Sequence, residues 1–270
     1  MIKENKIGFI GGGNMAEALI KGLISGGVPA KELLVAEPLA ARRDFLQERY
    51  EVSVTGENSA VMGACTVILL CIKPQIHAQA LQALQGTVRP DQLFISIMAG
   101  VKTAAVEELL GGTPRVVRVM PNTPALVMKG AAALSAGSHA TGEDLSLACN
   151  IFNMVGKSWV VEEKLLDAVT GLSGSGPAYV LTFIEALSDA GVKNGLTREA
   201  ATGLAAQTVL GTAKLLLETH EHPAVLRDKV TSPGGTTIAG VAAMEKAGIR
   251  NAVMAAVDAA TARSAELGKK

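Results

Sequence analysis

Short apolar runs alternate with helical patterns along the first half of the chain, and the first such unit stands close to its start. Residues 7–10, I-G-F-I, form an apolar run that leads directly into glycines at positions 11–13. Beyond these glycines, Met15, Ala18 and Leu19 recur at helical spacing. The pattern predicts a strand, a tight turn and a helix in immediate succession.

Further apolar runs of strand length follow. They lie at residues 33–36, 52–54, 66–72, 93–97, 116–120, 130–136 and 157–161. Helical patterns, such as that of residues 42–50, separate them. The run T-V-I-L-L-C-I at residues 66–72 is almost continuously apolar, as in a parallel strand that is covered on both faces. We therefore expect an α/β fold with a doubly wound, mainly parallel sheet and right-handed crossovers.

The pattern changes near residue 162, where strand signals end and long helical patterns rich in alanine and leucine begin. At 270 residues the chain is long enough for two domains. We place them at residues 1–161 and 162–270, the second being all-helical.

One predicted helix of the second half, residues 197–217, is apolar on two faces. Leu204 and Leu215 lie on one face, while Ala205 and Leu216 lie on another. A helix of this kind needs cover on both faces, and a few helices in so short a segment do not readily supply it. We expect subunits to associate, most simply as a symmetric homodimer. A compact monomeric bundle is the alternative.

The opening glycines carry a dinucleotide pattern, G-x-G-x-x-A, on Gly11, Gly13 and Ala16. The first glycine permits the turn, the second lets the backbone approach a pyrophosphate, and the small third residue allows helix and strand to pack closely. The helix N-terminus adds free N–H groups and a positive dipole end. This context favours a Rossmann dinucleotide site over a glycine-rich turn of another α/β protein. Further sequence elements typical of FAD proteins are not found, so we expect a nicotinamide cofactor.

Composition narrows the class of partner. The formal net charge is +0, which gives no electrostatic reason to expect nucleic acid or an anionic membrane. The most membrane-like stretch, residues 196–217, contains Arg198, Glu199, Gln207 and Lys214, so we expect a soluble helix. With no signal peptide pattern ahead of the first strand, we expect a cytoplasmic protein.

The residues that could bind metal are scattered. Cys65, Cys71 and Cys149 form no C-x-x-C pair and are expected to be small buried residues in a reducing compartment. The four histidines form no H-E-x-x-H or comparable ligand set, so we expect no metal.

Glu37 ends the second predicted strand, in V-A-E-P. An acidic residue at this position accepts hydrogen bonds from the adenosine 2′-hydroxyl and repels a 2′-phosphate, which favours NADH over NADPH. Arg42 and Arg43 open the next helix. They are either ligands of a 2′-phosphate or part of a solvated helix face.

A second glycine-rich segment, V-T-S-P-G-G-T-T at residues 230–237, precedes another predicted helix at residues 238–246. Its glycines leave the backbone N–H groups accessible, and Ser232, Thr236 and Thr237 add hydroxyls. This combination suits a small anion such as a carboxylate. A helix capped by serine or threonine after a turn is the alternative.

Six short motifs stand in order along the chain. They are I-G-F-I-G-G-G-N-M at residues 7–15, I-K-P-Q at 72–75, S-I-M-A-G at 96–100, R-V-M-P-N-T-P at 118–124, T-G-L-S-G-S-G-P-A-Y at 170–179 and S-P-G-G-T-T at 232–237. Together they make the chain resemble the pyrroline-5-carboxylate reductase family over essentially its whole length. The joint match favours the anion site at the last motif over a simple cap.

The resemblance implies a Rossmann domain followed by an all-helical domain for substrate binding and dimerisation, with dimers gathered into larger rings such as a pentamer of dimers. It implies hydride transfer from NADPH or NADH to the imine carbon of 1-pyrroline-5-carboxylate, giving L-proline. Many members of the family place Ser or Thr where Glu37 stands. That departure leaves the choice of cofactor open and leans toward tolerance of NADH.

The resemblance also implies roles for single residues. The pyrophosphate would be held by Ile10, Gly11, Gly12, Gly13, Asn14 and Met15, and the ribose and nicotinamide side would be lined by Asn58, Ile72, Lys73, Pro74 and Ala99. The substrate would be held by Ser232, Gly234, Gly235, Thr236 and Thr237, with Glu163 and Asp228 close to the substrate or its loop. Thr237 would be the catalytic residue, near the ring nitrogen. Lys73 either steadies the cofactor or is a solvated loop lysine.

Two alternative functions remain to be considered. The 3-hydroxyacid dehydrogenases use a lysine and an asparagine on the same helix face. Here Lys193 and Asn194 are adjacent and point apart. The other alternative is a nucleotide sensor without catalytic turnover, and the complete S-P-G-G-T-T segment argues against this hypothesis.

Overall fold

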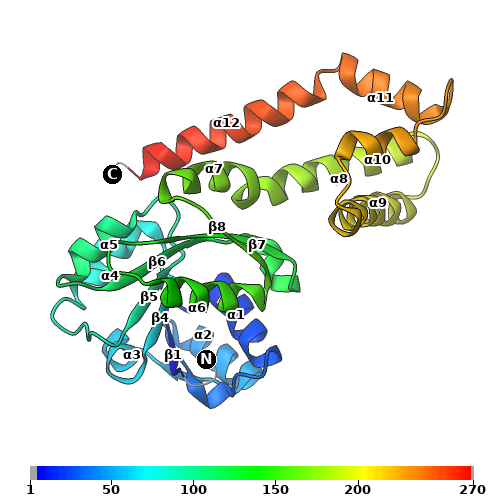
Figure 1. Ribbon diagram of the computed structural model, residues 1–270. Helices are drawn as coiled ribbons and strands as arrows, with labels where there is room; N and C mark the ends of the chain where they lie inside the picture. Colours follow the sequence, from blue (N-terminus) through cyan, green and yellow to red (C-terminus); the bar gives the residue numbers. More distant parts are fainter. Residues whose placement is uncertain (1–4, 269–270) are drawn as a thin grey trace. The chain divides into compact units, whose positions relative to one another are not determined.

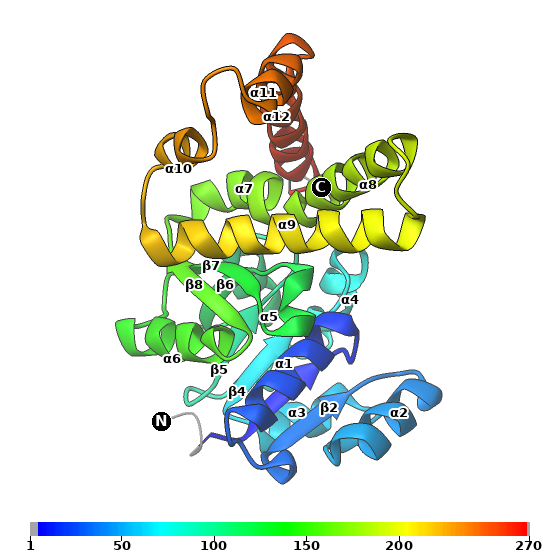
Figure 2. The same cartoon turned by 90° about the vertical axis from the view of Figure 1, so that its right-hand side faces the viewer.

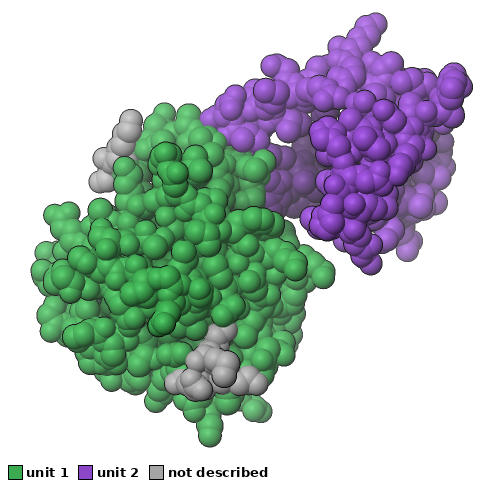
Figure 3. Space-filling view, viewed as in Figure 1, with its two compact units in different colours: residues 1–175, 259–270 green, residues 176–258 purple. Residues whose placement is uncertain are grey.

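The computed structural model describes residues 5–268. These residues form two compact units (Figure 3): one extends to Ser175 and includes the chain from Ala259 onward, and the other is residues 176–258. The boundary expected after residue 161 falls inside the first unit. The reason is that the short helices after the last strand, with the fully buried Leu166, pack against the sheet.

The first unit is built on an eight-stranded sheet (Figure 1). Its strands are β1 (Ile7–Ile10), β2 (Leu33–Ala36), β3 (Ser53–Thr55), β4 (Val67–Leu70), β5 (Leu93–Ser96), β6 (Arg115–Met120), β7 (Gly130–Ala136) and β8 (Gly156–Val160). Their order is β3-β2-β1-β4-β5-β6-β7-β8, and β6 with β7 is the antiparallel pair. The first six strands have the Rossmann order. The fold class expected from the alternating pattern is confirmed, with strand ends shifted by a few residues at most.

Helices cover both faces of this sheet. They are α1 (Asn14–Ser25), α2 (Ala40–Tyr50), α3 (Asn58–Ala64), α4 (His77–Gln82), α5 (Thr103–Leu110) and α6 (Gly142–Asn153). Short helical turns join them: η2 (Ala30–Glu32), η3 (Pro74–Ile76), η4 (Thr123–Val127), η5 (Glu163–Leu165), α7 (Leu166–Val169) and η6 (Thr170–Gly174). Helix α6 begins with a capping box, since the Thr141 hydroxyl accepts from the Asp144 N–H and the Asp144 carboxylate accepts from the Thr141 N–H.

The alternation of side chains along the strands produces two cores. In β4, Val67 and Leu69 belong to the core shared with α1, α2 and α6. Ile68 and Leu70 belong to the core shared with α3, α4 and α5. All four side chains are buried, which explains why this strand is apolar at every position.

The second unit is helical (Figure 2). It contains α8 (Gly176–Lys193), α9 (Arg198–Thr219), α10 (Pro223–Lys229), α11 (Thr236–Lys246) and the first part of α12 (Ile249–Leu267). Helices α8 and α9 pack closely at Gly191, where an added Cβ would lie 2.9 Å from the Cβ of Ala201. A larger residue would separate the two helices.

Helix α9 has one covered face and one uncovered face. Ala201 and Ala205 are buried, whereas Leu204 and Leu215 are exposed. By length and composition it is the one helix among residues 5–268 that could span a bilayer, although its most apolar window is only 11% buried. The uncovered leucines support the expectation that a second subunit covers this face.

Candidate functional site

The turn between β1 and α1 depends on glycine at position 11. Gly11 has φ +98°, and an added Cβ would lie 2.6 Å from the carbonyl oxygen of Cys71. Its N–H donates to the carbonyl of Ala36 at 2.8 Å, so the turn is fastened to β2. Only glycine fits this conformation and this spacing.

Gly13 differs from Gly11 in its geometry and surroundings. It is the N-cap of α1 with extended backbone, it is exposed, and an added Cβ would meet nothing within 4 Å. No side chain caps the helix there, so its first N–H groups face an open position. Ala16, one turn further on, is fully buried against the core of β1 and β2. This geometry suits a pyrophosphate at the helix N-terminus.

Replacing Gly11 by alanine is expected to destabilise the protein by about 1–3 kcal/mol, because alanine is strained at positive φ and meets the Cys71 carbonyl. It should also weaken NADH binding. Thermal unfolding and calorimetric titration with NADH measure the two effects.

Gly13→Ala is the matched control for this prediction. It should keep stability within about 1 kcal/mol and yet weaken NADH binding, since its new methyl group points to the open position. A Gly13→Ala protein with wild-type affinity for NADH would contradict a pyrophosphate at this turn.

Glu37 lies at the end of β2 with 9% of its surface exposed. Its Oε2 accepts from the Gly12 N–H at 2.9 Å, and its Oε1 accepts from the Leu39 N–H at 3.0 Å. The carboxylate is thus fixed beside the glycine turn, at the edge where an adenosine ribose binds in a Rossmann fold.

The two arginines after Glu37 are engaged and do not form a solvated helix face. Arg42 donates from Nε to the Gly12 carbonyl and from Nη2 to Glu17 Oε2, both at 2.6 Å. Arg43 Nη1 donates to the carbonyl oxygens of Glu37 and Pro38, at 2.7 and 2.8 Å. Neither pattern follows from sequence spacing, because the partners lie on different elements.

The other expected cofactor residues follow neighbouring strands. Asn58 opens α3 after β3; Ile72, Lys73 and Pro74 follow β4; and Ala99 follows β5. Since β2, β1, β4 and β5 are adjacent and parallel, the carboxyl ends of these strands share one edge with the glycine turn. Ligands of doubly wound sheets bind at this edge. Lys73 and Ala99 are exposed there.

Glu163 is held by the first unit itself. Its Oε1 accepts from the Thr103 N–H at 2.7 Å and from Arg118 Nη1 at 3.2 Å, and its Oε2 accepts from the Thr103 hydroxyl at 2.9 Å. It therefore caps α5 and pairs with a buried arginine, which lies in β6 between Ser96 and Ser135. Sequence reasoning missed Arg118 and Thr103, although an arginine inside the apolar run R-V-V-R-V-M was a signal for the first.

The chain's last helix also reaches the loop that follows β5. An added Cβ on Gly268 would lie 2.6 Å from the carbonyl oxygen of Gly100, and Ser264 donates to Asp167 Oδ1 at 2.7 Å. The loop that carries Ala99 is thus supported by residues far along the chain.

The second glycine-rich segment opens α11. Gly234 has φ +68°, and Gly235 is the N-cap, where an added Cβ would collide with the Ser232 hydroxyl. No side chain caps this helix, so the alternative of an ordinary Ser or Thr cap is not what the structure has. Thr236 and Thr237 are its first two residues and are exposed. Free N–H groups and hydroxyls are thus available to an anion.

Asp228 lies at the end of α10, a few residues before the segment. It is exposed and pairs with Arg227 at 3.4 Å. Such an exposed pair contributes little to stability, so it leaves the carboxylate free for other partners.

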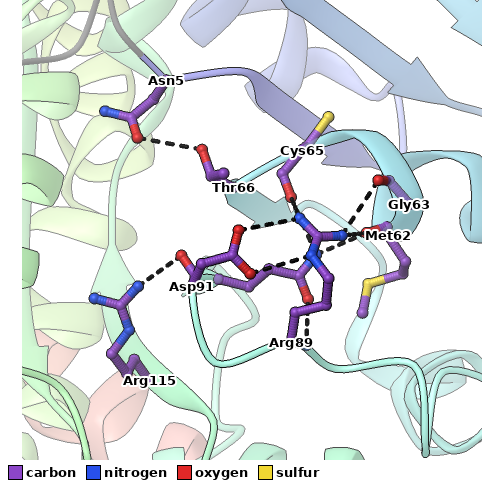
Figure 4. A network of polar contacts seen from close by, with 9 residues as sticks. Asn5, Met62, Gly63, Cys65, Thr66, Arg89, Asp91 and Arg115 are labelled. Atoms are coloured by element: carbon purple, nitrogen blue, oxygen red, sulfur yellow. Dashed lines mark hydrogen bonds and ion pairs between the residues drawn. The ribbon is translucent and has the colours of Figure 1, made fainter.

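A cavity of about 360 Å³ lies at the opposite edge of the sheet, at the amino ends of β5 and β6, between residues 85–90 and 110–113. Beside it, Arg89 donates to the carbonyls of Met62 and Cys65 and pairs with Asp91 (Figure 4). This network joins the loops at the amino ends and does not touch the glycine turn.

The cysteines are free, and only Cys65 is fully buried; Cys71 and Cys149 are half-buried. Burial raises the pKa of the Cys65 thiol to about 11 and also raises the pKa of Cys71, so both stay protonated near neutral pH. Across residues 5–268, no group of three or more His, Cys, Asp or Glu is placed to hold a metal ion.

Two known families match parts of the chain. The family described as NADP oxidoreductase, coenzyme F420-dependent, matches residues 6–100, which include the glycine turn. The family described as pyrroline-5-carboxylate reductase dimerisation matches residues 163–267, which include α8 to α12.

Relatives match over the full length. A pyrroline-5-carboxylate reductase of Synechocystis sp. is 51% identical over 269 residues, which is 98% of this chain and 99% of the relative. One of Methanosarcina acetivorans is 46% identical over 100% of both chains. Among solved structures, a pyrroline-5-carboxylate reductase from Coxiella burnetii has a TM-score of 0.93 at 37% identity, covering 98% of this chain and 99% of that one. The enzyme of Plasmodium falciparum with NADP bound has a TM-score of 0.89 at 33% identity, with the same coverage.

Proposed function

This chain belongs to the pyrroline-5-carboxylate reductase family, and from that premise we propose how its residues share the reaction. The activity is the NAD(P)H-dependent reduction of 1-pyrroline-5-carboxylate to L-proline, the last step of proline biosynthesis. We propose that residues 10–15 hold the cofactor and residues 232–237 hold the substrate. The observation that carries this division is the pair of helices, α1 and α11, whose N-termini follow glycine and have no side-chain cap.

The proposed cofactor site uses the carboxyl edge of the sheet. Its pyrophosphate binds the N–H groups of Gly13, Asn14 and Met15 at the start of α1. Glu37 binds the adenosine ribose. The segments after β3, β4 and β5, with Asn58, Ile72, Lys73, Pro74 and Ala99, line the remaining ribose and the nicotinamide.

The proposed substrate site is the start of α11. Backbone N–H groups at Gly234 and Thr236, with the Ser232 hydroxyl, bind the substrate carboxylate, and the helix dipole favours its negative charge. Gly235 shapes this turn, since its N–H donates to the Ser232 carbonyl at 3.0 Å. Thr237 presents its hydroxyl to the ring nitrogen. Thr237 is exposed and directly follows Thr236, one of the proposed carboxylate ligands, which supports that role.

Glu163 and Asp228 have supporting functions in this proposal. Glu163 fixes the start of α5 through Thr103 and so steadies the loop after β5. Asp228, at the end of α10, adjoins the substrate segment in sequence.

Hydride transfer to the imine needs little more than correct positioning of the two reactants and a source of protons. The imine carbon is electrophilic, and more so when the ring nitrogen is protonated. A reduced nicotinamide held by the cofactor residues would supply the hydride for the new C–H bond. The C=N π electrons would then go to the ring nitrogen, where a proton completes the amine. Holding both partners in reactive geometry can lower the barrier by several kcal/mol, out of a possible ~7–11. Thr237 orients the nitrogen and passes the proton from water.

We propose that the enzyme uses NADH in preference to NADPH. A Glu37→Ser protein should gain at least about tenfold in the ratio of kcat/KM for NADPH to that for NADH, equivalent to about 1.4 kcal/mol. The cause is loss of the repulsion between a carboxylate and a 2′-phosphate, with loss of the ribose hydrogen bond. Steady-state assays with both cofactors measure the ratio.

Glu37→Gln is the control, because it removes the charge and keeps an acceptor for the Gly12 N–H. It should shift the ratio in the same direction. A Glu37→Ser protein whose ratio of kcat/KM for NADPH to that for NADH does not rise would contradict the proposed preference.

We also propose how the chain divides into domains and how its copies assemble. Residues 1–161 form the nucleotide-binding part, and residues 162–270 bind substrate and form the subunit interface of a homodimer, with a pentamer of dimers as the larger assembly in the cytoplasm. The match to the dimerisation family from residue 163 supports the boundary. The exposed leucines of α9 support the interface.

A further inference from the structure

The backbone of Gly12 is held on both of its polar groups by charged side chains. Its N–H donates to Glu37 Oε2 at 2.9 Å, and its carbonyl accepts from Arg42 Nε at 2.6 Å. The glycine turn, the end of β2 and the start of α2 are therefore one hydrogen-bonded unit.

Arg42 is in turn held by α1. Its Nη2 lies 2.6 Å from Glu17 Oε2, and the other carboxylate oxygen of Glu17 accepts from the Tyr50 hydroxyl at 2.8 Å. Helices α1 and α2 contact one another, and this contact brings these groups together. We call Glu17, Arg42 and Tyr50 the Glu17 clamp.

The clamp is partly shielded from water and carries balanced charge. The side chains of Arg42 and Glu17 are 23% and 20% exposed. Burial by itself raises the pKa of Glu17, but hydrogen bonds from Arg42 and Tyr50 and the charges of Arg42 and Arg49 outweigh burial and lower the pKa below its ordinary value. Glu17 is thus a carboxylate near neutral pH, and it neutralises Arg42.

Arg42 stands where a 2′-phosphate would need a cation. It lies in the first turn of α2, directly after the Glu37 segment. An arginine near this position is the usual partner of the 2′-phosphate in Rossmann sites that take NADP. In this chain its guanidinium is directed to the glycine turn and to Glu17, and its face lies over Phe45, with 4.9 Å from Cζ to the ring centre.

We propose that Glu17, through the clamp, is a specificity-determining positioning residue that withholds Arg42 from a 2′-phosphate. The inference rests on the proposed preference for NADH at Glu37 and adds a second determinant on a different helix. Two carboxylates then act against NADPH: Glu37 repels its phosphate, and Glu17 occupies the arginine that would bind it.

The test compares four proteins: wild type, Glu37→Ser, Glu17→Ala and the double variant. Each is assayed for kcat/KM with NADPH and NADH, and for the Kd of adenosine 2′,5′-bisphosphate against that of 5′-AMP. The double variant should exceed Glu37→Ser by about tenfold in both preferences for the 2′-phosphate, equivalent to about 1.4 kcal/mol, because Arg42 can then form a charge-assisted pair with the phosphate. Adding Arg42→Met to the double variant should remove that gain.

Tyr50→Phe provides a milder variant in case Glu17→Ala lowers the melting temperature strongly. It loosens Glu17 by one hydrogen bond and should give a smaller shift in the same direction. The proposed role of Glu17 is contradicted if the double variant has the same preferences as Glu37→Ser. It is also contradicted if the gain in preference for the 2′-phosphate persists when Arg42→Met is added. A Glu37→Ser protein that does not shift at all overturns the proposed preference at Glu37, and the effect of Glu17→Ala is still read against that protein.

Discussion

Replacing Thr237 by alanine is expected to lower kcat for 1-pyrroline-5-carboxylate about 10²–10³-fold, the cost of losing one preorganised donor at the reacting group. The KM for NADH should stay near its wild-type value, because the proposed cofactor residues belong to other segments. Thr237 is an exposed residue in the first turn of α11, so its truncation should barely change stability. Initial rates followed by nicotinamide absorbance measure the effect.

Thr237→Ser is the matched control for that prediction. It keeps the hydroxyl and should retain most of the activity, whereas the alanine variant should not. A Thr237→Ala protein with near wild-type kcat would remove Thr237 from the reaction and leave positioning by the carboxylate site alone.

Much of the nucleotide half could be predicted because its signals are local. An apolar run, a glycine turn and a helical period lie within residues 7–20, and each constrains the backbone where it stands. The conformation of Gly11 and the burial of Ala16 match the functions expected of them. The near-continuous apolar run at β4 likewise predicted a strand covered on both faces, and it is one.

The polar contacts between elements could not be predicted in this way. Glu163 meets Thr103 and Arg118, which are 60 and 45 residues away in sequence. Arg42 meets Glu17 at a separation of 25 residues. Such pairs depend on how helices and strands pack, and periodicity carries no information about them. The family resemblance gave a location for Glu163, but the partners of its carboxylate came only from the structure.

The second large effect concerns the substrate's carboxylate. The proposed site offers two or three N–H or O–H donors at the start of α11, and charge-assisted hydrogen bonds of this kind contribute about 1.5–3 kcal/mol each. A cyclic imine without the carboxylate should therefore lose at least about 10²-fold in kcat/KM, at about 1.4 kcal/mol for each factor of ten. Ser232→Ala should reduce this discrimination, since it removes one donor while the backbone groups stay.

The most direct test of the division between a cofactor segment and a substrate segment is kcat/KM for 1-pyrroline-5-carboxylate against that for 1-pyrroline, with saturating NADH. The comparison uses the wild-type protein and the Ser232→Ala variant. We expect a ratio of at least about 10² for the wild type and a smaller ratio for the variant, with the KM for NADH unchanged. Equal turnover of the two imines by the wild type, or a ratio that Ser232→Ala leaves unchanged while the KM for NADH rises, would contradict the assignment of the carboxylate to this segment.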